Sequence, residues 1–262
     1  MELTEPGLRV KNAEKMQQSK RASGEEMRPA VSVIMPVYNG EKYIAQAVQS
    51  VYAQNIPLEL IVIDDGSVDG TREVLIPWEN RPDFVYIKNE RNLGAAGSRN
   101  RGVSVAKGRY VAFLDADDWW ENEKIEKQLQ ALEASKAVLC ATARELVRAD
   151  GKTLDRIIEI PECIQYQALL KTNCIPCSSV ILKTEVAREF YMCHDELHED
   201  YIMWLKILKK YGNAIGVNEP LVKCRMSEGG KSRNKLKSAR MQYGVYRYIG
   251  FNRMKAFYYM IY

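Results

Sequence analysis

The chain has 262 residues and a net charge of +4, and 46% of its residues are hydrophobic and 27% charged, as is typical of a soluble globular protein that can bury a full core. No apolar run approaches the roughly 18 residues of a membrane-spanning helix, and no apolar stretch at the N-terminus indicates a secretory signal. The six cysteines are too few for a disulfide scaffold at this length, so a reducing, cytoplasmic compartment is expected.

The order of predicted elements favours an α/β fold. Residues 1–28 are polar and aperiodic and are expected to form a flexible leader. Strands are then predicted over 31–35, 58–64, 84–88, 110–114 and 137–143, with helices between them over 41–54, 69–75, 95–106 and 121–134. Continuous apolar strands separated by helices indicate a mostly parallel sheet with helices on both faces. The second half is less regular, with a strand over 178–183 and a helix over 199–211.

The last part of the chain, 226–262, differs in composition from the domain expected over 29–225. From Lys223 onward there are ten Lys/Arg residues against one acid, Glu228, whereas the preceding residues are net acidic. We expect a basic, aromatic, helical segment. Lysine and arginine interleaved with tyrosine and phenylalanine are typical of the membrane interface, so peripheral membrane contact through 234–262 is one interpretation. A helix packed on the body or on a second subunit is the other, and no nucleic-acid recognition motif is present.

Three carboxylates follow the predicted strand 110–114. Two unit charges 4 Å apart repel by about 4 kcal/mol at an effective dielectric near 20, and a divalent cation would remove that cost. Asp115 and Asp117 are two residues apart and would face the same side of an extended chain. Few protein oxygens suit Mg²⁺ or Mn²⁺, which take further ligands from water or substrate phosphates. Asp118 alone would also suit the N-cap of the next helix.

Polar loops also follow the first two predicted strands, PVYNG at 36–40 and DDGS at 64–67, and each could be a simple turn. The glycines of 92–102 do not have the spacing of a dinucleotide-binding or P-loop motif. Cys174 and Cys177 have zinc-ligand spacing but no second pair, so packed thiols are the preferred interpretation.

Taken together, the motifs make the chain recognisable. VSVIMPVYNG (31–40), VIDDGSVDGT (62–71), NERNLGAAGSRNRG (89–102), YVAFLDADDWW (110–120) and HED (198–200) occur in this order, and from about residue 30 to about 225 the chain resembles the family 2 glycosyltransferases. The resemblance implies the GT-A fold, a Rossmann-like sheet that binds a nucleotide sugar, and inverting transfer. Each motif is individually weak, and the combination is specific.

The resemblance assigns nucleotide-sugar-binding roles to residues of the first motifs. Pro36 and Tyr38 would border the base, with the tyrosine ring as a stacking face. Asp65 would accept hydrogen bonds from the base edge, commonly uracil in this family. Arg99 would lie near the base or the phosphates.

The later motifs supply the metal site and the base. Asp115 and Asp117 would form the D-x-D motif, with Asp115 toward the ribose and the ion and Asp117 as a direct ligand of Mn²⁺ or Mg²⁺. Asp118 matches a third acid of the family. Asp200, beside Glu199, matches the catalytic base that takes the proton of the acceptor hydroxyl, and an N-cap role for Asp200 is compatible with this.

The sequence therefore predicts a metal-dependent, inverting glycosyltransferase with a nucleotide-sugar donor, UDP-linked, and a saccharide or lipid-linked saccharide acceptor. Bacterial surface polysaccharide synthesis at the cytoplasmic face of the cell membrane is the expected setting. Two alternatives stay open: a nucleotidyltransferase of related fold, and a non-catalytic sugar-nucleotide-binding protein.

Overall fold

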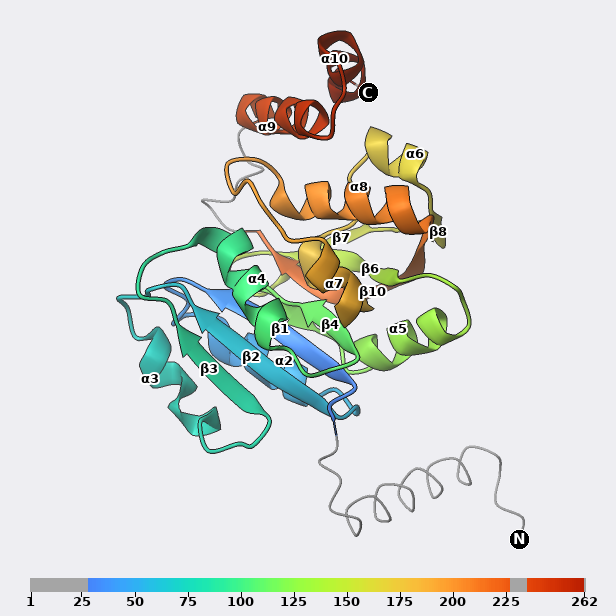
Figure 1. Cartoon of the computed structure of the whole chain (residues 1–262). Coiled ribbons are helices and arrows are strands. Elements are labelled where there is room, and N and C mark those ends of the chain that lie inside the picture. The colour runs from blue at the N-terminus through green and yellow to red at the C-terminus, as the bar shows by residue number, and fades with distance from the viewer. Residues whose placement is uncertain (1–27, 227–234, 262) are drawn as a thin grey trace, which may run out of the picture.

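The computed structural model describes residues 28–226 and 235–261, so the predicted leader lies outside the described residues except for Arg28. The remainder forms one mixed sheet with helices on both faces (Figure 1). The helices are α2 (Ile44–Tyr52), α3 (Thr71–Leu75), α4 (Gly94–Val105), α5 (Lys124–Glu133), α6 (Tyr166–Lys171), α7 (Thr184–Glu189), α8 (Glu199–Tyr211), α9 (Lys235–Tyr248) and α10 (Arg253–Ile261), with 3₁₀ turns at Ile76–Trp78 and Cys177–Ser179.

The sheet has the order β3-β2-β1-β4-β9-β6-β10-β5, and β7 and β8 pair with β6 and β10. Its strands are β1 (Val31–Val37), β2 (Leu58–Asp64), β3 (Phe84–Lys88), β4 (Tyr110–Phe113), β5 (Trp119–Trp120), β6 (Leu139–Val147), β7 (Thr153–Ile158), β8 (Cys163–Ile164), β9 (Ile181–Lys183) and β10 (Ala214–Arg225). The first four strands in this order are mutually parallel, as predicted. The sheet then reverses, because β9 is antiparallel to both β4 and β6, and β5 is antiparallel to β10.

Alternation along β1 shows why both faces of the sheet are covered. Val33 and Met35 pack into one buried cluster with α2 and α5, whereas Ile34 packs into the other with α4, α7 and α8. Figure 1 shows α2 and α4 on opposite sides of the sheet. Helix α4 approaches β1 closely: a Cβ on Gly102 would come within 2.5 Å of the Ile34 side chain. The β1–β4 half of the sheet is therefore a rigid platform whose carboxyl ends can carry a site.

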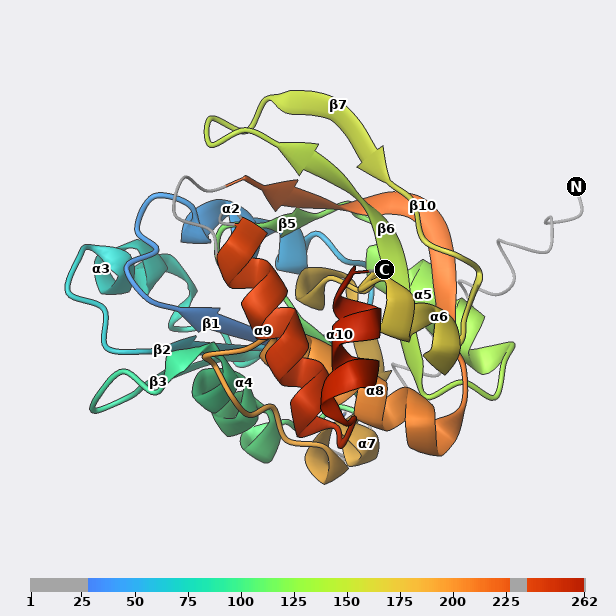
Figure 2. The same cartoon turned by 90° about the horizontal axis from the view of Figure 1, so that it is seen from above.

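The C-terminal segment is helical, as expected. Figure 2 shows α9 and α10 side by side above α8. Tyr246 on α9 is fully buried, and its hydroxyl donates to Leu170 O at 2.7 Å. Its ring packs with Phe251 and Tyr259 at centroid distances of 6.2 and 5.7 Å. One face of this helix pair thus belongs to the core of the body, as one of the two interpretations expected.

The opposite face of the helix pair is exposed. Leu236 and Met254 are 86% and 82% exposed, and Phe257, Tyr258 and Ile261 are each more than half exposed. None of the helices within residues 28–226 and 235–261 is long and apolar enough to cross a membrane.

Candidate active site

A cavity of about 540 Å³ lies at the carboxyl ends of β1, β2 and β4, where ligands bind in sheets of this kind. Six of the seven predicted site residues line it: Pro36, Tyr38, Asp65, Arg99, Asp115 and Asp117. The seventh, Asp200, does not line the cavity, but its neighbour Glu199 does. Residues spread over more than 160 positions of sequence are thus brought to one place.

The loops after β1 and β2 are tied to each other. Asn39 has a positive φ of 53°, and its side-chain oxygen accepts a hydrogen bond from Val68 N at 2.9 Å while its own N–H donates to Ser67 Oγ. Tyr38, just before it, is held with 54% of its surface exposed. A large aromatic ring exposed on a cavity wall suits stacking with a planar ligand.

The two aspartates at the end of β2 have different environments. Asp64 is fully buried and accepts hydrogen bonds from Tyr86 Oη at 2.5 Å and Ser67 N at 2.8 Å. Although burial raises it, these hydrogen bonds hold the pKa of Asp64 below its usual range. Asp65 lines the cavity and accepts from Leu93 N and Gly94 N at 2.8 and 2.9 Å. Asp64 is therefore structural, and Asp65 joins the cavity to the start of α4.

The three acids after β4 do not share one orientation. Asp115 and Asp117 line the cavity, whereas Asp118 is 8% exposed and is bound by Ser178 Oγ at 2.7 Å and by Arg225 N at 2.8 Å. The N-cap interpretation of Asp118 is wrong, because α5 begins only at Lys124 with Glu123 as its cap. Two carboxylates, not three, are presented to the cavity.

Asp117 has the carboxylate best suited to receive a cation. Burial, and then the charge of Asp115, raises the pKa of Asp117 to about 6. No ion pair involving Asp117 forms within the described residues. In the same part of the chain no group of three or more His, Cys, Asp or Glu side chains is arranged to hold a metal. The two carboxylates that line the cavity, Asp115 and Asp117, fit an ion that takes its other ligands from water and substrate phosphates.

Arg99 connects the two sides of the cavity. It is 4% exposed, and its guanidinium lies 2.6 Å from Asp115 Oδ1 and 3.0 Å from Glu199 Oε1. Both terminal nitrogens are thereby engaged by carboxylates. Its position near the nucleotide stays a prediction, but the contacts show a residue that orients two acids of the site.

Asp200 lies in the first turn of α8, whose cap residue is His198. The N-cap alternative for Asp200 is therefore wrong, and its carboxylate instead accepts from Tyr201 N at 2.7 Å. Burial, and then the charge of Glu199, raises the pKa of Asp200 to about 6. Carboxylates are favoured at the positive N-terminal end of a helix, which holds both acids beside the cavity.

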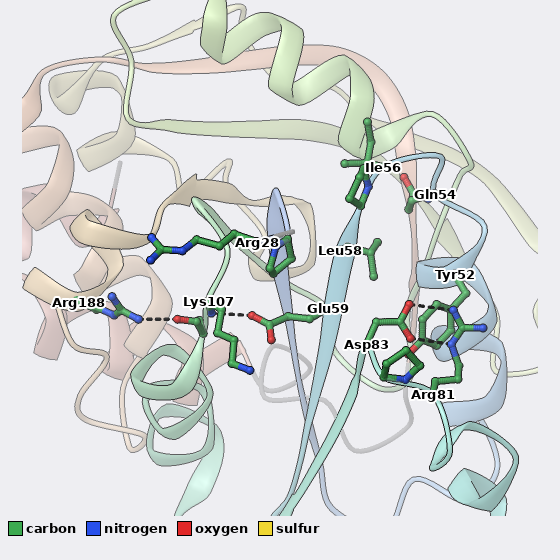
Figure 3. A pocket seen from close by; sticks show the side chains of 14 residues that line it. Arg28, Tyr52, Gln54, Ile56, Leu58, Glu59, Arg81, Asp83, Lys107 and Arg188 are labelled. Carbon is green, nitrogen blue, oxygen red and sulfur yellow. Dashed lines mark hydrogen bonds and ion pairs between the residues drawn. The ribbon is translucent and has the colours of Figure 1, made fainter. Parts of the chain in front are cut away.

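A second, larger hollow of about 810 Å³ lies at the opposite, amino ends of the strands (Figure 3). Its acids are already satisfied. Glu59 accepts from Ser32 Oγ and Lys107 N at 2.5 and 2.6 Å, and Asp83 pairs with Arg81. No predicted site residue lines it, so the smaller cavity is the candidate active site.

Residues 32–184, more than half of the chain, match the family described as glycosyl transferase family 2. The chain belongs to glycosyl transferase family 2. It is an enzyme of glycosyl transfer, and the similarity to the family that the motifs indicated is confirmed.

Two curated relatives of this family 2 enzyme are matched over most of their length. TuaG of Bacillus subtilis, provisionally named as a glycosyltransferase of teichuronic acid biosynthesis, is 39% identical over 224 residues, which are 85% of this chain and 89% of TuaG. WfaP of Escherichia coli is named as a UDP-Glc:alpha-D-GlcNAc-diphosphoundecaprenol beta-1,3-glucosyltransferase. It is 36% identical over 222 residues, 84% of this chain and 86% of WfaP.

Solved structures confirm the predicted GT-A fold. Residues 1–349 of TarS from S. aureus, in complex with UDP-GlcNAc, superimpose with a TM-score of 0.70 at 19% identity, covering 89% of this chain and 70% of that one. The mannosyltransferase PcManGT from Pyrobaculum calidifontis, in complex with GDP-Man and Mn²⁺, superimposes with a TM-score of 0.67 at 19% identity and covers 93% and 75%.

Proposed function

We propose that this family 2 enzyme is a metal-dependent, inverting glycosyltransferase that moves a sugar from a UDP-linked donor to a hydroxyl of a lipid-linked saccharide acceptor in bacterial surface polysaccharide synthesis. The observation that carries the proposal is that two pairs of acids, one after β4 and one at the start of α8, meet at one cavity. Asp115 and Asp117 line the cavity together with Glu199, Asp200 follows Glu199 in the first turn of α8, and Arg99 contacts both Asp115 and Glu199.

The donor's nucleotide would occupy the part of the cavity between the β1 and β2 loops. Pro36 and Tyr38 offer an apolar wall with an exposed ring, and Asp65 offers carboxylate oxygens at its floor. UDP is favoured over other nucleotides because WfaP, at 36% identity, is named for UDP-Glc and the TarS structure holds UDP-GlcNAc. The GDP-Man of PcManGT makes a guanine donor the alternative to test.

The ion would be held by Asp115 and Asp117, with the donor's phosphates and water as further ligands. When bound, Mn²⁺ or Mg²⁺ would neutralise negative charge on the departing diphosphate. The Mn²⁺ in the PcManGT structure supports a divalent ion at this fold. On the protein's side, Arg99 holds the carboxylate of Asp115 in place through the 2.6 Å contact.

Asp200 would take the proton of the acceptor hydroxyl as the hydroxyl attacks the anomeric carbon. A general base works best when its pKa lies near the working pH, and burial and Glu199 raise the pKa of Asp200 to about 6. Inversion follows from a single displacement with the base on the face opposite the leaving nucleotide. The position of Asp200 in the first turn of α8, next to the cavity-lining Glu199, supports a base close to the donor site.

The acceptor's lipid would be reached through the exposed face of α9 and α10. This face combines the exposed apolar side chains of Leu236, Met254 and Phe257 with the exposed basic residues Arg240 and Arg253. Such a combination suits an anionic membrane surface, which would place the enzyme on the cytoplasmic side of the membrane. The diphosphoundecaprenol acceptor in the name of WfaP supports a lipid-linked substrate.

Vesicle binding tests the membrane contact. The triple variant Leu236→Ser/Met254→Ser/Phe257→Ser is expected to lose binding to vesicles that contain anionic lipid. Ile157→Ser is the matched control, because Ile157 is an apolar side chain on β7 with 54% exposure and lies outside the helix pair. Equal binding by the wild type and the triple variant would remove the membrane contact from the proposal.

Donor consumption tests the function. UDP release from UDP-Glc and UDP-GlcNAc is measured with and without a synthetic diphospholipid-linked GlcNAc acceptor. We expect UDP release to depend on the acceptor, to need Mn²⁺ or Mg²⁺, and to be lost in the Asp200→Asn variant. Nucleotide binding without transfer to any acceptor would favour the non-catalytic alternative, and the family assignment already disfavours a nucleotidyltransferase.

A further inference from the structure

Arg225, the last residue of β10, is a buried arginine whose partners are unusual. It is 8% exposed, yet its guanidinium forms no ion pair with any carboxylate of the described residues. A charged group taken out of water is costly unless its donors are satisfied. The partners that satisfy it therefore indicate what the residue holds in place.

Those partners are main-chain carbonyls of two separate segments and one amide. Nε donates to Asp117 O at 2.9 Å, and Nη1 donates to Ala149 O at 2.8 Å and to Arg148 O at 3.3 Å. Nη2 donates to Oε1 of Gln46, on α2, at 2.8 Å. The fixed fork of a guanidinium is suited to this geometry in a way that a lysine ammonium is not.

Two aromatic rings enclose the same group. The guanidinium carbon lies 4.2 Å from the ring centroid of Tyr43 and 4.9 Å from that of Trp119, within the range of cation–π attraction. Tyr43 also lines the active-site cavity, and Trp119 follows directly on the D-x-D turn. The charge of Arg225 is thus held against the back of that turn.

The main chain of Arg225 adds a second contact to the turn. Its N–H donates to Asp118 Oδ1 at 2.8 Å, and the other oxygen of that carboxylate accepts from Ser178 Oγ. One residue therefore binds the carbonyl of Asp117 with its side chain and the carboxylate of Asp118 with its backbone. Asp118 is turned away from the cavity by this contact, and Asp117 is left facing it.

We propose that Arg225 is a positioning residue of the D-x-D turn, which fixes the peptide of Asp117 so that its carboxylate faces the metal and the donor's diphosphate. The inference rests on the proposed function, because it assumes that Asp117 serves a metal-bound nucleotide. Groups that orient a metal ligand without touching the metal typically change metal affinity by about 10–100-fold when they are removed.

The test is calorimetric titration of UDP at increasing Mn²⁺ concentrations, with the thermal midpoint of each protein measured in parallel. Arg225→Lys keeps the charge but cannot reach the same set of acceptors, and it is expected to raise the half-saturating Mn²⁺ concentration at least about tenfold. Arg188→Lys is the matched control. Arg188 also donates to main-chain carbonyls, those of Val103 and Ala106, at the other end of the sheet, and its variant is expected to keep wild-type Mn²⁺ dependence.

An Arg225→Lys protein with wild-type Mn²⁺ dependence overturns the inference, and so does an equal shift in Arg188→Lys, since the effect would then follow lost stability. If Arg225→Lys does not fold, the Gln46→Ala variant tests the inference instead. Gln46 lies on the exposed face of α2, and its replacement removes only one of the hydrogen-bond partners of the Arg225 guanidinium. An unchanged Mn²⁺ dependence in Gln46→Ala then overturns the inference, and a rise of about twofold or more supports it. A wild type that binds UDP with no dependence on Mn²⁺ refutes the proposed metal site itself, which distinguishes the two failures.

Discussion

Replacing Arg99 by methionine is expected to destabilise the fold by more than the loss of a surface ion pair would. The side chain of Arg99 is 5% exposed and that of its partner Glu199 is 9% exposed, so the substitution breaks an ion pair that is buried on both sides. Breaking a buried pair in this way costs about 3–5 kcal/mol. The second partner, Asp115, is 35% exposed and keeps contact with water, so the loss of its ion pair with Arg99 adds little to the destabilisation.

Urea unfolding at neutral pH measures this loss as a shift of the midpoint. The double variant Arg99→Met/Glu199→Leu removes both charges and is expected to recover most of the stability. Arg81→Met is the matched control, because Arg81 pairs with Asp83 while 46% exposed, and its loss should be about 1 kcal/mol or less. A loss of under about 1 kcal/mol for Arg99→Met, or a double variant no more stable than the single, would refute the reasoning.

Three further predictions concern other parts of the molecule. Lys124 is fully buried with its Nζ 4.0 Å from the Trp120 ring centroid, and burial lowers its pKa from 10.5 to about 7, a difference of about 5 kcal/mol. Because the unfolded chain binds the extra proton between these values, stability should rise with pH across that window. Lys124→Met should therefore be more stable than the wild type at pH 7 and below, and urea midpoints that show no such gap contradict this. Burial and the charge of Glu199 raise the pKa of Asp200 to about 6, so the rate of sugar transfer should fall tenfold per pH unit below that value as Asp200 becomes protonated. The Asp200→Asn variant should transfer sugar about 10²–10⁴-fold more slowly than the wild type. A flat pH–rate profile would argue for another base. Tyr246→Ala should lower the free energy of unfolding by about 3–5 kcal/mol, because the Tyr246 side chain is fully buried where α9 packs on the body. A smaller change in stability, measured from the urea midpoint, would mean that α9 does not belong to the core.

The first half of the fold was predictable because its pattern is local. In β1 and β2 every residue but Pro36 is buried, so each strand is mostly apolar in sequence, and the intervening helix has clear 3.6-residue spacing. The rule that ligands bind at the carboxyl ends of parallel strands then brought the residues of three loops to one cavity. The structure confirms this half of the sheet, and the roles of the site residues stay predictions.

In the second half, the predicted helix over 199–211 is present as α8 and the predicted strand over 178–183 contains β9, but the rest was missed for equally physical reasons. Strand β10 is 12 residues long, yet it contains Pro220 and a shift of register between Val217 and Val222, features that normally end a strand. Its pairing partners and the antiparallel β9 depend on contacts distant in sequence. The sheet therefore proved more mixed than the sequence indicated.

The site residues that sequence reasoning missed have their partners far away in the chain. Arg225 is 108 residues from Asp117 and 179 from Gln46, and an arginine near the end of an unpredicted strand carries no local signal. Glu199, and not Asp200, lines the cavity. Which of these two acids reaches the cavity depends on the position of the first turn of α8 and not on residue type. Both would have required the tertiary structure.

Calorimetric binding of UDP, with and without Mn²⁺, to the wild type, to Asp117→Ala and to Asp83→Ala tests the central claim most directly. Asp83 is a surface acid paired with Arg81 far from the cavity, so its variant controls for the loss of a charge. The account predicts Mn²⁺-dependent binding to the wild type and to Asp83→Ala, and no such binding to Asp117→Ala. UDP binding that is equally strong without Mn²⁺, or unchanged in Asp117→Ala, would contradict it.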